Sequence, residues 1–175
     1  MFALISRDQV RSARIHQLYD YWYEKCAGRA VPDRCDIDPA ELTSLLPYLL
    51  IAEAEAQPFR ILYRLVGTKV VDMNGAEFTG LYLDEMTGEQ YNYIDRGTEA
   101  YRHAWSQQCP VYGIYDWPAK SGAIYLVEFC ILPVTRAGSA GQFIALEDWQ
   151  ISDAELPCHD PPLPFITPQR RAEDQ

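Results

Sequence analysis

The stretch Phe59–Asn74, which reads FRILYRLVGTKVVDMN, constrains the fold more than any other part of the chain. Its first half alternates side chains as a β-strand does. Gly67 and Thr68 then turn the chain directly into a helix of about two turns, expected from Lys69 to Asn74 and closed by Gly75. We expect the segments that follow to fold back over the sheet. The face predicted to point inward carries Phe59, Ile61, Tyr63 and Leu65.

The segment before this strand predicts its partner. Leu49–Ala56 alternates apolar and acidic residues, as a half-buried strand does, and Gln57-Pro58 joins it to Phe59. A two-residue connection of this kind predicts an antiparallel hairpin. Carboxylates of the first strand are expected to face arginines of the second; the residues are Glu53, Glu55, Arg60 and Arg64.

The rest of the chain adds helices before and after the hairpin and strands at the end. Ser6 and Gln9 fit a capping box that starts an amphipathic helix over 7–27. Asp38-Pro39 starts a short helix. A long helix is expected over 89–107, and strands over 111–117, 123–132 (ending before Pro133) and 142–149.

These elements predict an α+β fold, because strands and helices do not alternate as they would in a parallel sheet. We expect an N-terminal amphipathic helix over 1–28 and the main domain over 29–150. Residues 151–175 are rich in proline and predict a flexible tail.

Composition excludes several classes of partner. The net charge is −10, from 15 Lys and Arg against 25 Asp and Glu, which disfavours nucleic acids and anionic membranes. No stretch has the features of a signal peptide or a membrane helix. The chain has five cysteines at irregular spacing without a zinc pattern, so we expect reduced thiols and a cytoplasmic protein; the cysteines are Cys26, Cys35, Cys109, Cys130 and Cys158.

No catalytic or metal-binding constellation is predicted. The sequence lacks phosphate-binding loops and nucleophile motifs. His103 lies half a turn away from the apolar stripe of its helix and is expected to face solvent, and His16 and His159 have no supporting pattern. Glu128, within an apolar strand, is either on a solvated face or a buried acid with a partner, and we favour the solvated face.

Several phrases of the sequence occur together in one family. They are Trp22, Pro32-x-Arg34-x-Asp36-Ile37-Asp38-Pro39 with Leu46-Pro47, Tyr63-Arg64-Leu65-Val66-Gly67-Thr68, Gly75, Thr79-Gly80, and Glu128-Phe129-Cys130-Ile131-Leu132-Pro133. With this order and spacing, residues 15–150 resemble a bacterial family of short, single-domain PAS proteins. The resemblance implies a PAS-like five-stranded antiparallel sheet of order 2-1-5-4-3 with helices on one face, and a regulatory role without established catalytic residues.

The resemblance also suggests where a ligand would bind. PAS domains bind small molecules between the sheet and the long helix, and the sequence shows neither a haem ligand nor the cysteine of covalent flavin photosensors. These side chains either line such a pocket or simply fill the core. The candidates are Tyr63, Leu65, Met73, Phe78, Leu81, Ile94, Tyr101, Trp105, Tyr115 and Trp117.

Three functional hypotheses follow. The first is a sensory module that acts through contacts with an unknown signalling protein, tuned by a small apolar or aromatic ligand. A homodimer contact is expected on the first helix, at Leu18, Tyr19, Trp22 and Tyr23. The alternative is an isomerase or hydratase on a cone-shaped α+β fold, with Glu128 or Asp116 as its acid or base. The third is a structural interaction domain with a filled core.

Overall fold

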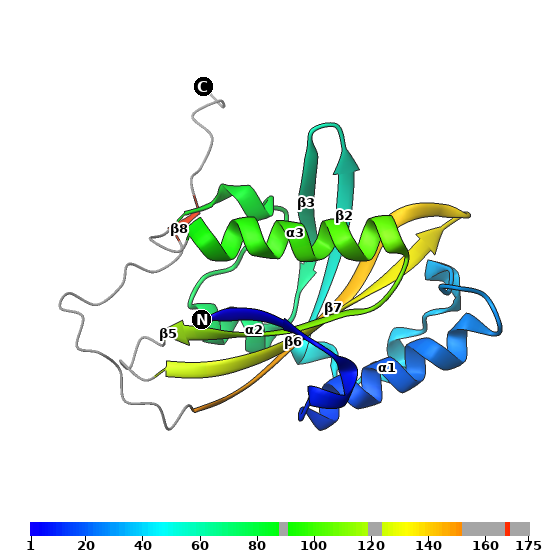
Figure 1. The fold of residues 1–175 in the computed structure, drawn as a ribbon, viewed down its shortest axis with the longest axis horizontal. Coiled ribbons are helices and arrows are strands. Elements are labelled where there is room, and N and C mark those ends of the chain that lie inside the picture. The colour runs from blue at the N-terminus through cyan, green and yellow to red at the C-terminus, as the bar shows by residue number, and fades with distance from the viewer. Residues whose placement is uncertain (88–90, 119–123, 152–166, 169–175) are drawn as a thin grey trace.

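The structure is a computed structural model that describes residues 1–87, 91–118, 124–151 and 167–168 (Figure 1). Its helices are α1 (Ala13–Cys26), α2 (Thr68–Asn74) and α3 (Tyr91–Gln107). Its strands are β1 (Phe2–Ile5), β2 (Leu49–Ala56), β3 (Phe59–Val66), β4 (Met86–Thr87), β5 (Val111–Pro118), β6 (Ile124–Arg136), β7 (Ser139–Ile151) and β8 (Thr167–Pro168). Short 3-10 helices occupy Arg7–Gln9, Arg34–Asp36, Pro39–Leu42, Leu46–Tyr48 and Leu83–Glu85.

One antiparallel sheet organises the described chain, with the order β1-β5-β6-β7-β2-β3. The five predicted strands keep the predicted order, which is confirmed, and β1 adds a sixth at the edge beside β5. The expected helix start at residue 7 was wrong, because Arg7–Gln9 is a 3-10 turn and α1 starts at Ala13. Phe2 pairs with Tyr115 in the sheet, and its ring packs on Tyr115 and Phe129 with centroids 6.3 and 5.5 Å apart. This aromatic burial holds the first residues in the sheet rather than in a helix.

Helix α1 is capped by Ser12, whose side chain accepts a hydrogen bond from the Ile15 amide at 3.1 Å. The Ser6–Gln9 signal belongs instead to the preceding 3-10 turn. The Glu128 carboxylate on β6 accepts the amide hydrogens of Arg11 and Ser12 at 2.8 and 2.9 Å, and Glu128 is only 5% exposed. Its expected place on a solvated face was wrong, because the strand presents this acid to the free amides of a helix start.

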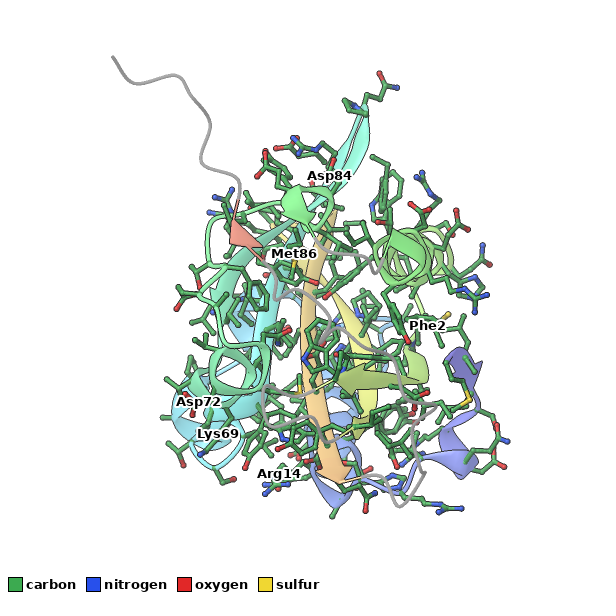
Figure 2. All side chains as sticks on the ribbon, turned by 90° about the vertical axis from the view of Figure 1, so that its left-hand side faces the viewer. Phe2, Arg14, Lys69, Asp72, Asp84 and Met86 are labelled. Atoms are coloured by element: carbon green, nitrogen blue, oxygen red, sulfur yellow. The ribbon has the colours of Figure 1, made fainter. Side chains whose placement is uncertain are left out.

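The helices cover both faces of the sheet. Helix α1 packs on one face, and α2 and α3 lie on the other (Figure 1). We call the cluster between the sheet and the α2–α3 face the α3-side core. Its buried members include Ala52, Ile61, Tyr63, Val70, Met73, Phe78, Ala100, Tyr101, Tyr115, Val127, Phe129 and Phe143. In Figure 2, α3 is seen end-on, and Phe2 lies below it on the side of the N-terminal strand.

The hairpin of β2 and β3 contains a bulge that changes the predicted faces. Ile51 pairs with Leu65 but Ala52 pairs with Tyr63, so Arg64 is an extra residue on β3. A bulge residue reverses the alternation beyond it. Leu65 is consequently 45% exposed and Val66 is buried, and the prediction that Leu65 faces the interior was wrong.

The charges along this hairpin have partly different partners from those expected. Arg64 pairs with Glu53, as predicted. Arg60 instead donates two hydrogen bonds to Asp84 at 2.8 and 2.7 Å, and Tyr82 donates to Glu55. These contacts hold the segment between α2 and α3 against the β2–β3 hairpin.

Gly67 makes the junction between β3 and α2 possible. Its amide donates to the Leu49 carbonyl at 2.7 Å, and a Cβ atom on Gly67 would lie 2.3 Å from the Pro47 carbonyl oxygen. Only glycine permits such a close approach of two backbones. Helix α2 then runs from Thr68 to the left-handed Gly75, as the sequence predicted to within one residue.

Strand β6 continues through Pro133, where the sequence predicted its end. Its neighbour β5 begins at Val111 opposite Ile131, so Pro133 has no strand on that side and its missing amide hydrogen costs no ladder bond. The Pro133 carbonyl accepts from the Trp22 indole at 2.8 Å. The predicted flexible tail lies outside the described residues, except that β8 pairs with β4.

Candidate functional site

Nine of the ten predicted pocket residues lie in or against the α3-side core. Leu65 is the exception because of the bulge on β3. The nine come from the strands, from α3 and from the segments around α2, and so converge from distant parts of the chain. Those that are buried are Tyr63, Met73, Phe78, Tyr101 and Tyr115, and those that are partly buried are Leu81, Ile94, Trp105 and Trp117.

One acid that was not predicted from the sequence faces the same core. Glu147 on β7 lies directly opposite Phe129 of β6 and follows Phe143 and Ala145, both buried in the α3-side core, at strand spacing. The alternation in QFIALEDW carried this signal, since Phe143, Ala145, Glu147 and Trp149 share one face. The acidic pair Glu147-Asp148 resembled a solvated strand end, and this concealed it.

Tyrosine hydroxyls surround Glu147. The Tyr115 hydroxyl acts on the carboxyl of Glu147, and the hydroxyls of Tyr63 and Tyr101 act on each other. Burial raises the pKa of Glu147 to about 7, although the Tyr115 hydroxyl lowers it. Burial likewise raises the pKa of all three tyrosines, and the charge of Glu147 adds to the effect. The α3-side core therefore holds a carboxyl that changes its charge near neutral pH.

Aromatic rings build the wall beside this carboxyl. Tyr115 has four ring neighbours, with centroids between 5.9 and 6.3 Å away; they are Phe2, Tyr93, Trp117 and Phe129. Cross-strand packing is tight at Gly113, where a Cβ atom would lie 2.4 Å from the Phe129 ring. The positions of these rings are therefore fixed from β1, β5, β6 and α3.

This end of the α3-side core is not sealed from solvent. Glu147 is partly exposed, as are Trp117, Tyr125 and Trp149. By contrast, Val127 and Phe143, farther along the same face, are fully buried. The Glu147 residue is thus partly exposed, whereas its carboxyl is surrounded closely enough to lose much of its hydration.

The two acids proposed for an enzyme do not face this core. Glu128 caps α1 on the opposite side of the sheet. Asp116 alternates with Tyr115 and Trp117 along β5 and so points to the other face of the sheet, and it forms an ion pair with the Met1 amino group at 2.8 Å. Neither residue therefore has the position that the isomerase or hydratase hypothesis required of it.

The histidines and cysteines form no metal site among the residues that the structure describes. His103 is exposed on α3, and the His16 ring contacts the Val10 carbonyl at 3.0 Å; His159 lies outside the described residues. No cluster of three or more potential metal ligands occurs among the residues that the structure describes. Cys26, Cys35, Cys109 and Cys130 carry free thiols. None of the described helices is long and apolar enough to cross a membrane.

The predicted dimer contact on α1 divides into two pairs. Leu18 and Trp22 are 0% and 2% exposed and pack against the chain's own sheet, so their prediction as contact residues was wrong. Tyr23 is 65% exposed and stacks on Tyr19 at 5.9 Å. The apolar stripe of α1 packs against the sheet, and Tyr23 is the exposed large hydrophobic residue on the outer face of the helix.

Comparisons with known proteins agree with this architecture. A model of the PAS domain matches residues 10–145. Among solved structures, the Vibrio cholerae VqmA dimer, described as a LuxR-type receptor in the absence of its target DNA, matches with a TM-score of 0.50 and 14% identity over 73% of this chain. The match spans 59% of the VqmA chain, and at this identity the likeness concerns the fold alone. No curated protein matches. From the family match over most of its length, the chain belongs to the PAS domain family.

Proposed function

We propose that this PAS domain is a sensory module that binds a small molecule at the Glu147 end of the α3-side core. One observation carries the proposal: a carboxyl and three tyrosine hydroxyls face an otherwise apolar, aromatic interior. A mostly apolar site with a few convergent polar groups is typical of small-molecule binding. PAS domains generally have a sensory role. The binding of a small molecule at this site is the further part of our proposal.

The energetic cost of Glu147 supports a binding role over mere core filling. Ionised carboxylates in apolar surroundings are disfavoured unless they are paired and hydrogen-bonded. A leucine or methionine at position 147 would fill the same layer without this cost. Titratable groups with strongly shifted pKa values occur most often at functional sites, where their role in binding or catalysis offsets the stability lost by burying them.

Occupancy of the site would be transmitted by protein contact. The proposed contact surface is the outer face of α1, where Tyr19 and Tyr23 stack and the Arg7 guanidinium lies 3.8 Å over the Tyr19 ring. Exposed aromatic and arginine side chains are enriched at protein interfaces. The partner is either a second copy of the chain or another signalling protein, and we propose a cytoplasmic location on the basis of the free thiols.

Glu147 also gives the enzyme hypothesis a new candidate. A carboxyl with a pKa near 7 is suited to proton transfer at neutral pH. The tyrosines around it have raised pKa values, so at neutral pH they offer hydrogen-bond donors rather than a second base. Membership of a family of sensory domains favours binding. A bound molecule that is recovered chemically unchanged after long incubation would support binding against turnover.

Native mass spectrometry of the protein purified from its source tests the proposal. We expect a mass above that of the chain alone, lost on denaturation, and a lower occupancy in Glu147→Gln. Glu99→Gln, which removes an exposed charge on α3, is the matched control and should keep the bound mass. If the native and denatured masses of the wild-type protein agree under all purification conditions, the proposed ligand is contradicted. The hypothesis of a domain with a filled core would then remain.

A further inference from the structure

The ligand class follows from the surroundings of Glu147, provided that the proposed binding function holds. Tyr115 from β5 is the titratable group that acts on Glu147, and Glu147 in turn raises the pKa of Tyr63 from β3 and of Tyr101 from α3. All three are neutral below their raised pKa values. In the part of the chain that the structure describes, no lysine, arginine or histidine forms an ion pair with Glu147.

The neighbouring acid on β7 shows the contrast. Asp148 points to the other face of the sheet, where it pairs with Arg14 at 2.8 Å and accepts a hydrogen bond from Ser12 at 2.6 Å. Its charge is thus matched within the chain. Glu147, one residue earlier, faces the aromatic layer, where the neutral Tyr115 hydroxyl acts on its carboxyl.

A single hydroxyl donor leaves most of a carboxylate unused. An ionised carboxylate offers about four acceptor positions, and one tyrosine donates one hydrogen. The missing component is a positive charge with several N–H donors. A protonated amine would supply this component, because an ammonium group carries a full positive charge and as many as about three N–H donors.

The surrounding rings favour the same chemistry. Phe129 lies directly opposite Glu147 in the sheet, and Trp149 follows it on the same face of β7. Aromatic rings attract cations through their faces, and tryptophan does so most strongly. An apolar ring on the ligand would in turn pack against Tyr115 and its neighbours. Charge and apolar body are therefore both accommodated at adjacent positions.

We propose that the site binds a small aromatic or apolar amine, with its ammonium group on the Glu147 carboxylate and its apolar body against the Tyr115–Phe129 rings. Because the cation binds the ionised acid, affinity should increase with pH. The pKa of about 7 for Glu147 puts this increase between about pH 6 and about pH 8, a range in which a primary alkylamine stays protonated.

Three probes of one skeleton test the charge preference: phenethylamine, 2-phenylethanol and phenylacetate. Binding to the full chain would be measured by calorimetry and by tryptophan fluorescence at pH 6 and pH 8. At pH 8 we expect the amine to bind at least about 10-fold more tightly than the alcohol, and phenylacetate to bind most weakly. The amine should bind more weakly at pH 6, whereas the alcohol should not change.

The variants locate the effect. Glu147→Gln should weaken amine binding by about 10-fold or more and remove its pH dependence while leaving the alcohol unaffected. Glu99→Gln changes the net charge equally and should behave like the wild type. Circular dichroism and thermal unfolding establish that each variant is folded. Equal binding of amine and alcohol, unchanged amine affinity in Glu147→Gln, or no binding of any probe would overturn the amine assignment. If native mass spectrometry still detects a bound molecule in that case, the proposed binding function stands and the ligand belongs to another chemical class.

Discussion

The Tyr115 hydroxyl on β5 acts on the Glu147 carboxyl on β7 and lowers its pKa, although β6 lies between their strands. The pair connects the edge of the sheet, where Phe2 packs on Tyr115, with its centre. A change in the ionisation of Glu147 would therefore act on the ring cluster that holds β1 in the sheet.

Glu147 should make the stability of the fold depend on pH. Its pKa is raised from 4.5 to about 7, so the folded state binds this proton more tightly than the unfolded chain and loses stability as the pH rises between these values. At pH 8 we expect Glu147→Gln to be more stable than the wild type by roughly 1–3 kcal/mol, and at pH 4 we expect little difference.

Urea unfolding at both pH values measures this difference. The exposed-site variant Glu99→Gln should follow the wild-type curve throughout. Parallel pH profiles for the wild type and Glu147→Gln would show that the carboxyl is hydrated in the folded state.

Gly67 should be irreplaceable at the junction of β3 and α2. A Cβ atom there would overlap the Pro47 carbonyl, which is backbone and cannot move aside. We expect Gly67→Ala to destabilise the protein by on the order of 1–3 kcal/mol, measured by thermal unfolding. Gly97→Ala is the matched control, since its Cβ would meet only the Leu83 side chain at an ordinary 3.5 Å, and it should be neutral or stabilising. Equal effects of the two changes would contradict the close contact.

Glu128 should act as a structural cap for α1. Its carboxylate accepts the Arg11 and Ser12 amides, which would otherwise be unpaired at the helix start. We expect Glu128→Ala to cost about 1–3 kcal/mol of unfolding free energy and to leave ligand binding unaffected. Glu24→Ala on the exposed face of α1 should change stability little. Loss of probe binding in a folded Glu128→Ala protein would argue against a purely structural role.

The α1 contact surface is best tested by a point change. Deletion of residues 1–28 would remove β1 and the buried stripe Ile15, Leu18 and Trp22, and would unfold the domain rather than separate two copies. If copies associate through Tyr19 and Tyr23, Tyr23→Arg should lower the molar mass seen by light scattering toward 20.0 kDa. Gln17→Arg, also exposed on α1, should not. A molar mass that stays at the wild-type value in Tyr23→Arg would exclude this surface as the dimer contact.

Much of the architecture was predictable because its signals are local. The alternation in Leu49–Ala56 and Phe59–Val66 and the two-residue turn between them determine a hairpin whatever surrounds it. The helical stripe Ile15, Leu18, Trp22 and Cys26 likewise specified which face of α1 is buried. Most of the interior aromatic residues were found in the same way.

The site acid was not found, because a carboxylate on an alternating strand has the same pattern on either face. Glu128 and Glu147 lie on neighbouring strands and point to opposite sides of one sheet. Which side receives α1, with its free amides, and which receives the aromatic layer under α3 is a property of the packed domain. The sequence order of the residues does not contain it.

The sequence by itself determined the hairpin and the glycine turn into α2, since these follow from periodicity and short-range turn chemistry. Its resemblance to PAS proteins implied the order of the central strands and the family of the fold. Only the tertiary structure decided that Arg64 bulges and turns Leu65 outward, that Pro133 sits where β6 lacks a neighbour, and that Glu147 faces the tyrosines. Each depends on what lies across the sheet from the residue, and this is set by pairing and layer packing between segments distant in the chain.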